Sequence, residues 1–127
     1  MTAPMPYQYV VLRAVPRAER EEFVNVGVVL RCQAADFLGA DFARSPERLA
    51  ALAPDLDLAA VDAALGVVCD VAKGVEGGGL PRLADDGRRF GWLSAPRSTV
   101  IRPGPVHSGL TTDPAAELQR LMDRLVR

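Results

Sequence analysis

Residues 23–32, FVNVGVVLRC, decide the fold, because they carry the strongest strand pattern in the sequence. Every second residue from Val24 to Cys32 is apolar, which is the period of a strand that turns one face to a core. The residues between them form a mixed set: Phe23, Asn25, Gly27, Val29 and Arg31. We therefore predict a strand with one apolar face against helices and one partly exposed face.

Two further strands are predicted beside this one. Residues 7–13 are rich in aromatic and β-branched residues and are followed by Pro16. Residues 36–42, DFLGADF, indicate a shorter third strand. The connector 16–22 is too short for a long crossover. The three strands are therefore expected to form an antiparallel meander.

Helices are predicted where capping signals precede apolar periodicity. Residues 45–47, SPE, offer an N-cap, a proline at the first helical position and an acid in the first turn, and Pro54 ends this short helix. Asp57 caps a longer helix that Gly74 ends. Residues 113–114, DP, repeat the signal before a terminal helix.

The segments between these helices are predicted to be irregular or extended. Residues 77–79 are glycines in a flexible loop, residues 85–87 (DDG) indicate a turn, and residues 90–93 and 98–102 are strand-like. The prolines at 96, 103 and 105 favour an edge strand over a central one.

The order of elements predicts an α+β fold. We expect an antiparallel sheet of about four strands with helices packed mainly on one face, in a single domain over residues 1–127. The 49% apolar and 24% charged residues are close to globular averages. Cys32 and Cys69 lie in apolar segments and indicate free buried thiols.

The start of the sequence lacks a signal-peptide pattern, and no apolar run approaches the roughly 20 residues of a membrane helix. We therefore expect a cytoplasmic protein without membrane contact. Fourteen of the fifteen basic residues are arginine, which a GC-rich genome explains without any selection for arginine chemistry.

The net charge of −1 conceals a strongly segmented distribution. Residues 36–87 carry ten acids and four bases, a net −6, whereas residues 88–112 carry four arginines and no acid. Four arginines are few for nucleic acid, which usually needs many phosphate contacts. The basic block either faces the acidic part of its own fold or binds an external anionic partner, and these two interpretations have about equal support.

Few residues are suited to catalysis. His107 is the only histidine, so no histidine-pair metal motif exists, and its neighbour Ser108 does not form a nucleophile motif with it. Residues 77–79 lack the lysine and hydroxyl residue of a phosphate-binding loop. We predict no metal and no cofactor, and we expect a non-enzymatic protein more than an enzyme.

Residues 7–32 and 89–114 resemble the two hallmark blocks of an uncharacterised bacterial family, domain of unknown function 3037. The resemblance implies no established activity. It does imply an accessory or regulatory role toward HipA-like kinases, beside which members are thought to be encoded. The candidate binding residues carried by the two blocks are Asn25, Trp92, Arg97, Ser98, Thr99 and His107, and the structural positions are Glu22, Gly27, Pro96 and Gly109.

Two functions follow from these residues. The first is a protein-interaction or regulatory module that uses the polar sheet face and the Arg97 loop, with a HipA-like kinase as the suspected partner. The alternative is a small-ligand or nucleotide-phosphate site, which includes a small enzyme among its forms, in which Asn25, Arg97 and His107 line a shallow pocket beside Gly27. A purely structural interpretation has Trp92 fill the space that Gly27 leaves.

Overall fold

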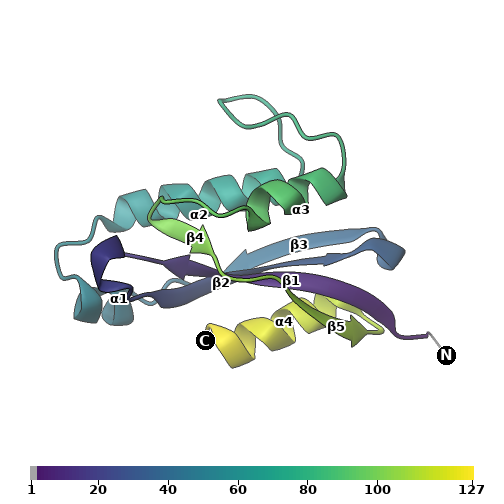
Figure 1. The fold of residues 1–127 in the computed structure, drawn as a ribbon, viewed down its shortest axis with the longest axis horizontal. Helices are drawn as coiled ribbons and strands as arrows, with labels where there is room; N and C mark the ends of the chain where they lie inside the picture. Colours follow the sequence, from purple (N-terminus) through teal and green to yellow (C-terminus); the bar gives the residue numbers. More distant parts are fainter. Residues whose placement is uncertain (1–2) are drawn as a thin grey trace.

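The computed structural model describes residues 3–127, in which five antiparallel strands form one sheet (Figure 1). Strands β1 (Met5–Ala14), β2 (Val24–Cys32) and β3 (Phe37–Phe42) follow one another as the predicted meander. Strands β4 (Ile101–Pro103) and β5 (His107–Thr111) both pair with the other side of β1. The sheet order is β3-β2-β1-β4, with β5 also beside β1.

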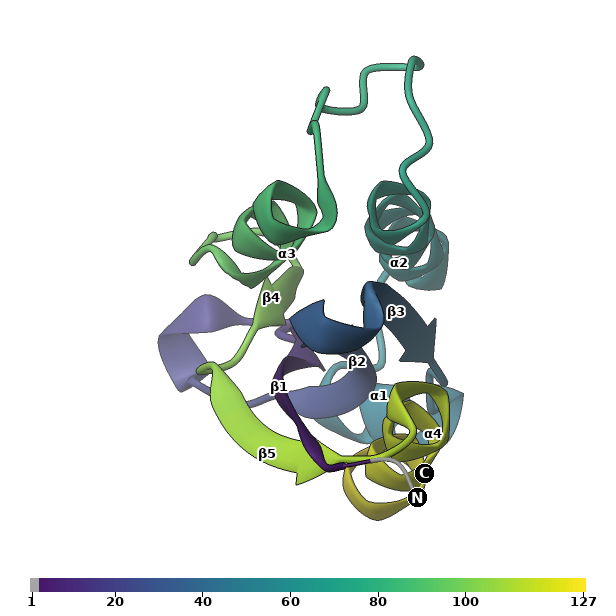
Figure 2. The same cartoon turned by 90° about the vertical axis from the view of Figure 1, so that its right-hand side faces the viewer.

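Helices cover both faces of this sheet (Figures 1 and 2). Helices α2 (Leu58–Ala72) and α3 (Asp86–Ser94) lie side by side on one face, and α4 (Pro114–Leu125) lies on the other. The short α1 (Pro46–Leu52) precedes α2, and two 3-10 turns, η1 (Ala18–Arg20) and η2 (Gln33–Ala35), follow β1 and β2. The α+β class and the antiparallel sheet are confirmed, with one strand more than expected and with α4 on the second face.

The three predicted helices are confirmed, and the predicted caps Asp57 and Asp113 are formed, whereas Ser45 precedes α1 without a side-chain capping bond. Asp57 accepts a hydrogen bond from the backbone N–H of Ala60, and Asp113 accepts one from that of Ala116, each at 3.2 Å. Such side-chain acceptors satisfy backbone donors that a helix start leaves without partners. Gly74 follows the end of α2 with a φ of +77°, a conformation that glycine adopts without strain.

Helix α3 overturns two of the predictions. The turn predicted at residues 85–87 is instead a helix start, where Asp85 Oδ1 accepts from the backbone N–H of Arg88 at 2.8 Å. The strand predicted at residues 90–93 is wrong as well, because these residues are helical. Phe90 and Leu93 are three positions apart and both are buried, which places them on one helical face.

A β-bulge overturns the predicted single apolar face of β2. Leu12 pairs with Gly27 but Arg13 pairs with Asn25, so Val26 is an extra residue in β2. The bulge reverses the alternation of side chains. Before it, Val24 and Val26 pack in the core with α2 and α3, and after it the even-numbered residues Val28, Leu30 and Cys32 pack in the core with α4.

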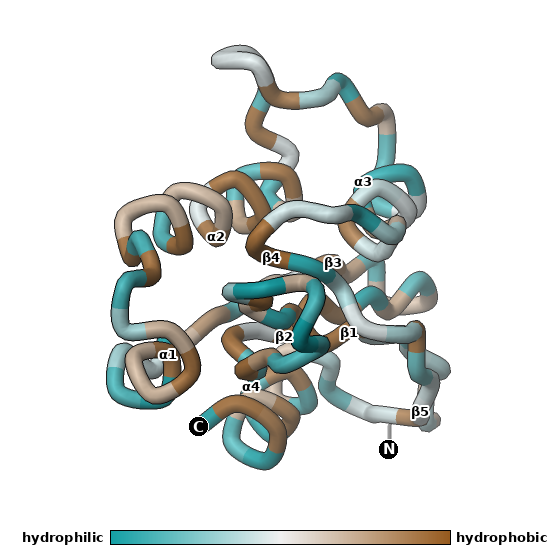
Figure 3. Tube along the Cα trace, turned by 60° about the vertical axis from the view of Figure 1, so that its left-hand side comes forward, coloured by the Kyte–Doolittle hydropathy of each residue, from teal (hydrophilic) through white to brown (hydrophobic). Residues whose placement is uncertain are grey.

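The molecule therefore has two cores, one on each side of the sheet. The first joins the sheet to α1, α2 and α3, and the second joins it to α4. In Figure 3 the tube of α4 alternates between brown and teal, as expected for a helix with one face on a sheet. Of the residues predicted for the mixed face of β2, Gly27 and Val29 are buried, Asn25 and Arg31 are half-buried, and Phe23, just before the strand, is exposed. The predicted polar sheet face is therefore not one exposed surface.

Candidate functional site

Trp92 and Arg97, two of the predicted binding residues, lie together. Arg97 follows α3, and its guanidinium carbon lies 4.3 Å from the centre of the Trp92 ring. The same guanidinium donates a hydrogen bond to the backbone carbonyl of Trp92 through Nη2. Burial lowers the pKa of Arg97 below its usual value. The pair is a cation–π contact that holds the loop after α3 against that helix.

A hollow of about 310 Å³ lies beside this pair. Trp92, Arg97 and Thr99 line one side of it, and the rest of its wall is apolar: Ala64, Val67, Val68 and Ile101. Neither Asn25 nor His107 lines this hollow. The shallow pocket suggested for Asn25, Arg97 and His107 is therefore not formed as one site.

The side chain of Asn25 makes a structural contact within the protein. Its Nδ2 donates a hydrogen bond of 3.1 Å to the backbone carbonyl of Leu125, at the end of α4. The last carbonyls of a helix have no partner within the helix, so this amide satisfies one of them. Asn25 thereby ties β2 to the second core.

His107 lies on the outer strand of the sheet. It pairs in register with Tyr9, and the two rings stack with centroids 5.2 Å apart. The side chains of His107 and Ser108 are both exposed. This arrangement places the predicted His107 on an edge surface and not in a pocket with Arg97.

Gly27 and Gly109 are positions where a neighbour approaches closely. A Cβ atom on Gly27 would lie 2.7 Å from the carbonyl oxygen of Asp41, so β3 and not Trp92 occupies the space. A Cβ atom on Gly109 would lie 2.5 Å from the hydroxyl oxygen of Tyr7, whose ring covers this glycine across the strand pair. Both glycines are explained by packing.

The remaining predicted residues lie on the surface. Glu22 forms an ion pair with Arg20 in the connector after β1. Pro96, Ser98 and Thr99 are exposed in the loop before β4, where the Thr99 hydroxyl donates to the backbone carbonyl of Ile101 at 2.7 Å. This loop is held by hydrogen bonds from its side chains to backbone carbonyls.

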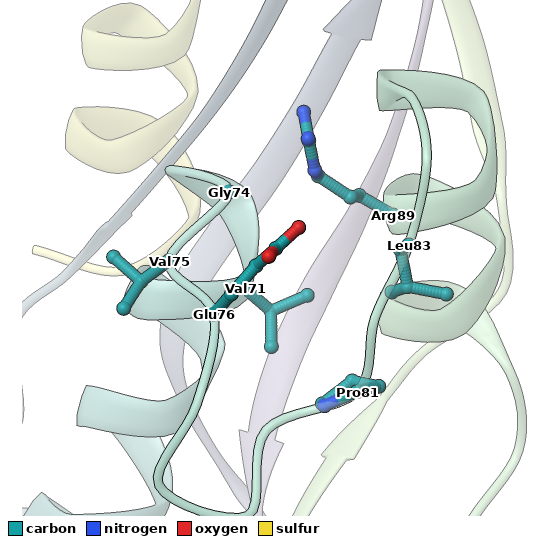
Figure 4. A pocket seen from close by; sticks show the side chains of 7 residues that line it. All are labelled: Val71, Gly74, Val75, Glu76, Pro81, Leu83 and Arg89. Carbon is teal, nitrogen blue, oxygen red and sulfur yellow. The ribbon is translucent and has the colours of Figure 1, made fainter.

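Half of the basic block is balanced within the fold. Arg88 and Arg89 form ion pairs with Asp85 and Asp86 in the first turn of α3. Arg89 also reaches toward Gly74 at the end of α2, as Figure 4 shows. The crevice in this figure has essentially no room for a water molecule, so it is packing between α2, α3 and their loop.

The other half of the block, Arg97 and Arg102, forms no ion pair among residues 3–127. Arg102 lies directly opposite Arg13 of β1. Arg13 was not singled out from the sequence. The sequence did offer one indication: Arg13 is the charged residue that ends a strand rich in apolar and aromatic residues.

Within the described part of the chain, no group of three or more His, Cys, Asp or Glu side chains is placed to hold a metal ion. None of the helices in that part is long and apolar enough to span a bilayer. The absence of a cofactor remains a prediction.

Comparisons with curated proteins and with solved structures gave no match. A comparison with protein families gave one, to the family described as "Protein of unknown function (DUF3037)", over residues 9–126. The match begins within β1 and runs through α4; it covers residues 9–32 of the first block and all of the second, and the two blocks pair with each other through β1, β4 and β5. The chain therefore belongs to the DUF3037 family.

Proposed function

We propose that this protein is a non-enzymatic interaction module that adds an extended segment of a partner protein to its sheet edge at β5. The observation that carries the proposal is the outer side of β5. Among residues 3–127, only β1 pairs with this strand, and its main contacts are with β1. Its outward backbone groups are free to pair with another strand.

Strand β5 itself lacks two features that usually block strand addition, a charged side chain and a proline, although Pro103 and Pro105 lie just before it. Residues 103–112, PGPVHSGLTT, contain no Asp, Glu, Lys or Arg. Leu110 is 69% exposed and Val106 is 47% exposed. The opposite edge differs: β3 is flanked by α2 and α4, and its Asp41 is bonded to Gln119 and Arg127. The β5 edge is thus the more accessible of the two.

The exposed residues of the second family block gather along the same stretch of chain. The Arg97 loop leads into β4, and β4 leads through residues 104–106 into β5. Exposed side chains along this stretch belong to Pro96, Ser98, Thr99, Val106, His107, Ser108 and Leu110. A partner strand would take its affinity from backbone hydrogen bonds and its specificity from these side chains.

A HipA-like kinase is the first partner to test, because the family resemblance implies an accessory role toward such kinases. The module would then act as a regulator of the kinase. For strand addition, the partner segment needs only an extended backbone and an apolar side chain that contacts Leu110. A segment that is disordered when free and becomes ordered on binding meets both requirements.

The test is co-purification of the tagged protein with a HipA-like kinase from the same cell. We expect a complex with the unchanged protein and at least a tenfold loss of binding for Leu110→Lys, since a charge on an edge strand opposes strand addition. Val75→Lys is the matched control: Val75 is a 44% exposed apolar residue in the loop after α2, away from β5 and outside the hollow beside Trp92. It should bind as the unchanged protein does.

Three results would contradict the proposal. If the kinase does not bind, the suspected partner is wrong. If Leu110→Lys and Val75→Lys bind equally well, β5 is not the binding edge. Light scattering of the purified protein tests whether a second copy occupies the edge. A dimer that Leu110→Lys converts to a monomer would assign the edge to self-association instead.

A further inference from the structure

Two arginines lie face to face at the other end of β1. Arg13 of β1 and Arg102 of β4 are direct partners in the antiparallel register. Directly paired residues project from the same face of a sheet with Cβ atoms about 5 Å apart. Asn25 of β2 is the partner of Arg13 on its other side, so the three residues form a row across three strands.

Neither guanidinium is held in an ion pair within the described residues. No carboxylate of residues 3–127 forms an ion pair with Arg13 or Arg102. Arg102 donates through Nε to the backbone carbonyl of Thr99 at 2.8 Å. The Nε of Arg13 is buried and has no hydrogen-bond partner. Like charges directly opposite each other destabilise a sheet, and a buried donor without an acceptor adds to that cost.

A hollow of about 410 Å³ opens beside this pair. This volume lies in the usual range of small-ligand sites. Arg13 and Arg102 supply its positive charge, and its other walls are Val15, Ala18, Glu21, Phe23 and Pro103. The guanidinium carbon of Arg13 lies 4.2 Å from the centre of the Phe23 ring, which holds the charged group in place.

We propose that this Arg13–Arg102 hollow binds the phosphate group of a small organic phosphate. A phosphate dianion neutralises both guanidinium groups and supplies acceptors for donors that the fold leaves free. The apolar walls then contact the organic part of the ligand. The site is separate from the β5 edge and does not depend on strand addition there.

The other hollows fit an anion less well. The hollow beside Trp92 has mainly apolar walls and a single arginine, whose guanidinium covers the Trp92 ring. The hollow lined by Arg31, Gln8 and Ser108 has a single arginine. Only the Arg13–Arg102 hollow, among those described, places two arginines without carboxylate partners on one wall.

Calorimetry and NMR with phenyl phosphate test the proposal. We expect binding to the unchanged protein, with a shift of the Arg13 and Arg102 guanidinium resonances as both groups gain an anionic partner. Arg13→Gln and Arg102→Gln should each weaken binding about tenfold or more, because each removes charge-assisted hydrogen bonds. Arg124→Gln, on α4, is the matched control and should bind normally. Glu21→Gln should bind more tightly, because it removes a negative charge from the hollow.

Inorganic phosphate and phenylacetate distinguish the parts of the ligand. Inorganic phosphate should bind more weakly than phenyl phosphate, and phenylacetate more weakly still. The proposal is overturned if the Arg13 resonance of the unchanged protein does not move, if Arg124→Gln loses as much affinity as Arg13→Gln, or if phenylacetate binds as tightly as phenyl phosphate. The resonance of the unchanged protein decides the matter even if Arg13→Gln does not fold.

Discussion

The hydroxyl group of Tyr7 donates a hydrogen bond of 2.8 Å to Oε1 of Glu117, which joins the first strand to the first turn of the last helix. Arg120, one turn later, donates through Nε to both oxygens of the same carboxylate at 3.0 Å. The two ends of the chain are therefore linked by a charged hydrogen-bond network at the edge of the second core.

This network makes the free energy of unfolding depend on pH in the acid range. The hydrogen bond from Arg120 first, and that from Tyr7 after it, hold the pKa of Glu117 below its usual value, although burial opposes them. A carboxyl group whose pKa is lower in the folded than in the unfolded state stabilises the fold at pH values above its unfolded pKa of about 4.3. This stabilisation is lost as the pH falls through the pKa of the folded state. Glu117→Gln should therefore be less stable than the unchanged protein at pH 7, and the difference should shrink below pH of about 4.

Urea denaturation at several pH values, followed by circular dichroism, measures this difference. Glu76→Gln, in the exposed loop after α2, is the control and should match the unchanged protein throughout. Tyr7→Phe should cost about 1 kcal/mol at pH 7, because it removes one hydrogen bond and leaves the Arg120 pair. A constant difference for Glu117→Gln at every pH would show that the carboxylate charge does not stabilise the fold.

Gly27→Ala should destabilise the protein by about 1–3 kcal/mol. The added Cβ would lie 2.7 Å from the carbonyl oxygen of Asp41, a backbone atom of β3 that cannot rotate away. Gly66→Ala is the matched control, because Gly66 lies inside α2 with nothing within 4 Å of an added Cβ. This control should gain about 0.5–1 kcal/mol from helix propensity. Equal effects in thermal unfolding would contradict the close approach at the bulge.

Arg97→Met should change the fluorescence of Trp92, the only tryptophan. Methionine keeps much of the length of the side chain but removes the guanidinium that covers the indole ring. We expect stronger quenching by acrylamide, together with a loss of about 0.5–1 kcal/mol in stability. Arg124→Met, on α4, should leave the quenching unchanged. Identical quenching of Trp92 in both variants would mean that Arg97 does not cover the ring in solution.

Local signals in the sequence were sufficient for most elements. Asp57 and Asp113 predicted two helix starts because a cap acts on backbone groups only three residues away. Asp85 offered the same capping signal. However, Gly87 favoured a turn at residues 85–87, and the aromatic residues Phe90 and Trp92 favoured a strand at residues 90–93. Phe90 and Leu93 are three positions apart, which is the spacing of one helical face, and this spacing indicated the helix that forms there.

The candidate site was predicted only in part. The sequence pointed to Trp92 and Arg97, which do lie together, because they are five residues apart and meet through one helix end. It grouped Asn25 and His107 with them, although Asn25 bonds to α4 and His107 stacks on Tyr9. It missed Arg13, whose importance comes from its cross-strand partner Arg102, 89 positions later.

The sequence by itself determined the α+β class, the first three strands, the helices with clear caps and the division of charge, because all of these depend on neighbouring residues. Only the tertiary structure decided how β4 and β5 pair with β1, where the bulge at Val26 exchanges the two faces of β2, and which arginines keep carboxylate partners. The arginines illustrate the difference between local and tertiary information. Arg88 and Arg89 are neutralised by acids one helical turn away, whereas Arg13 and Arg102 meet each other across a strand pair that no local pattern specifies.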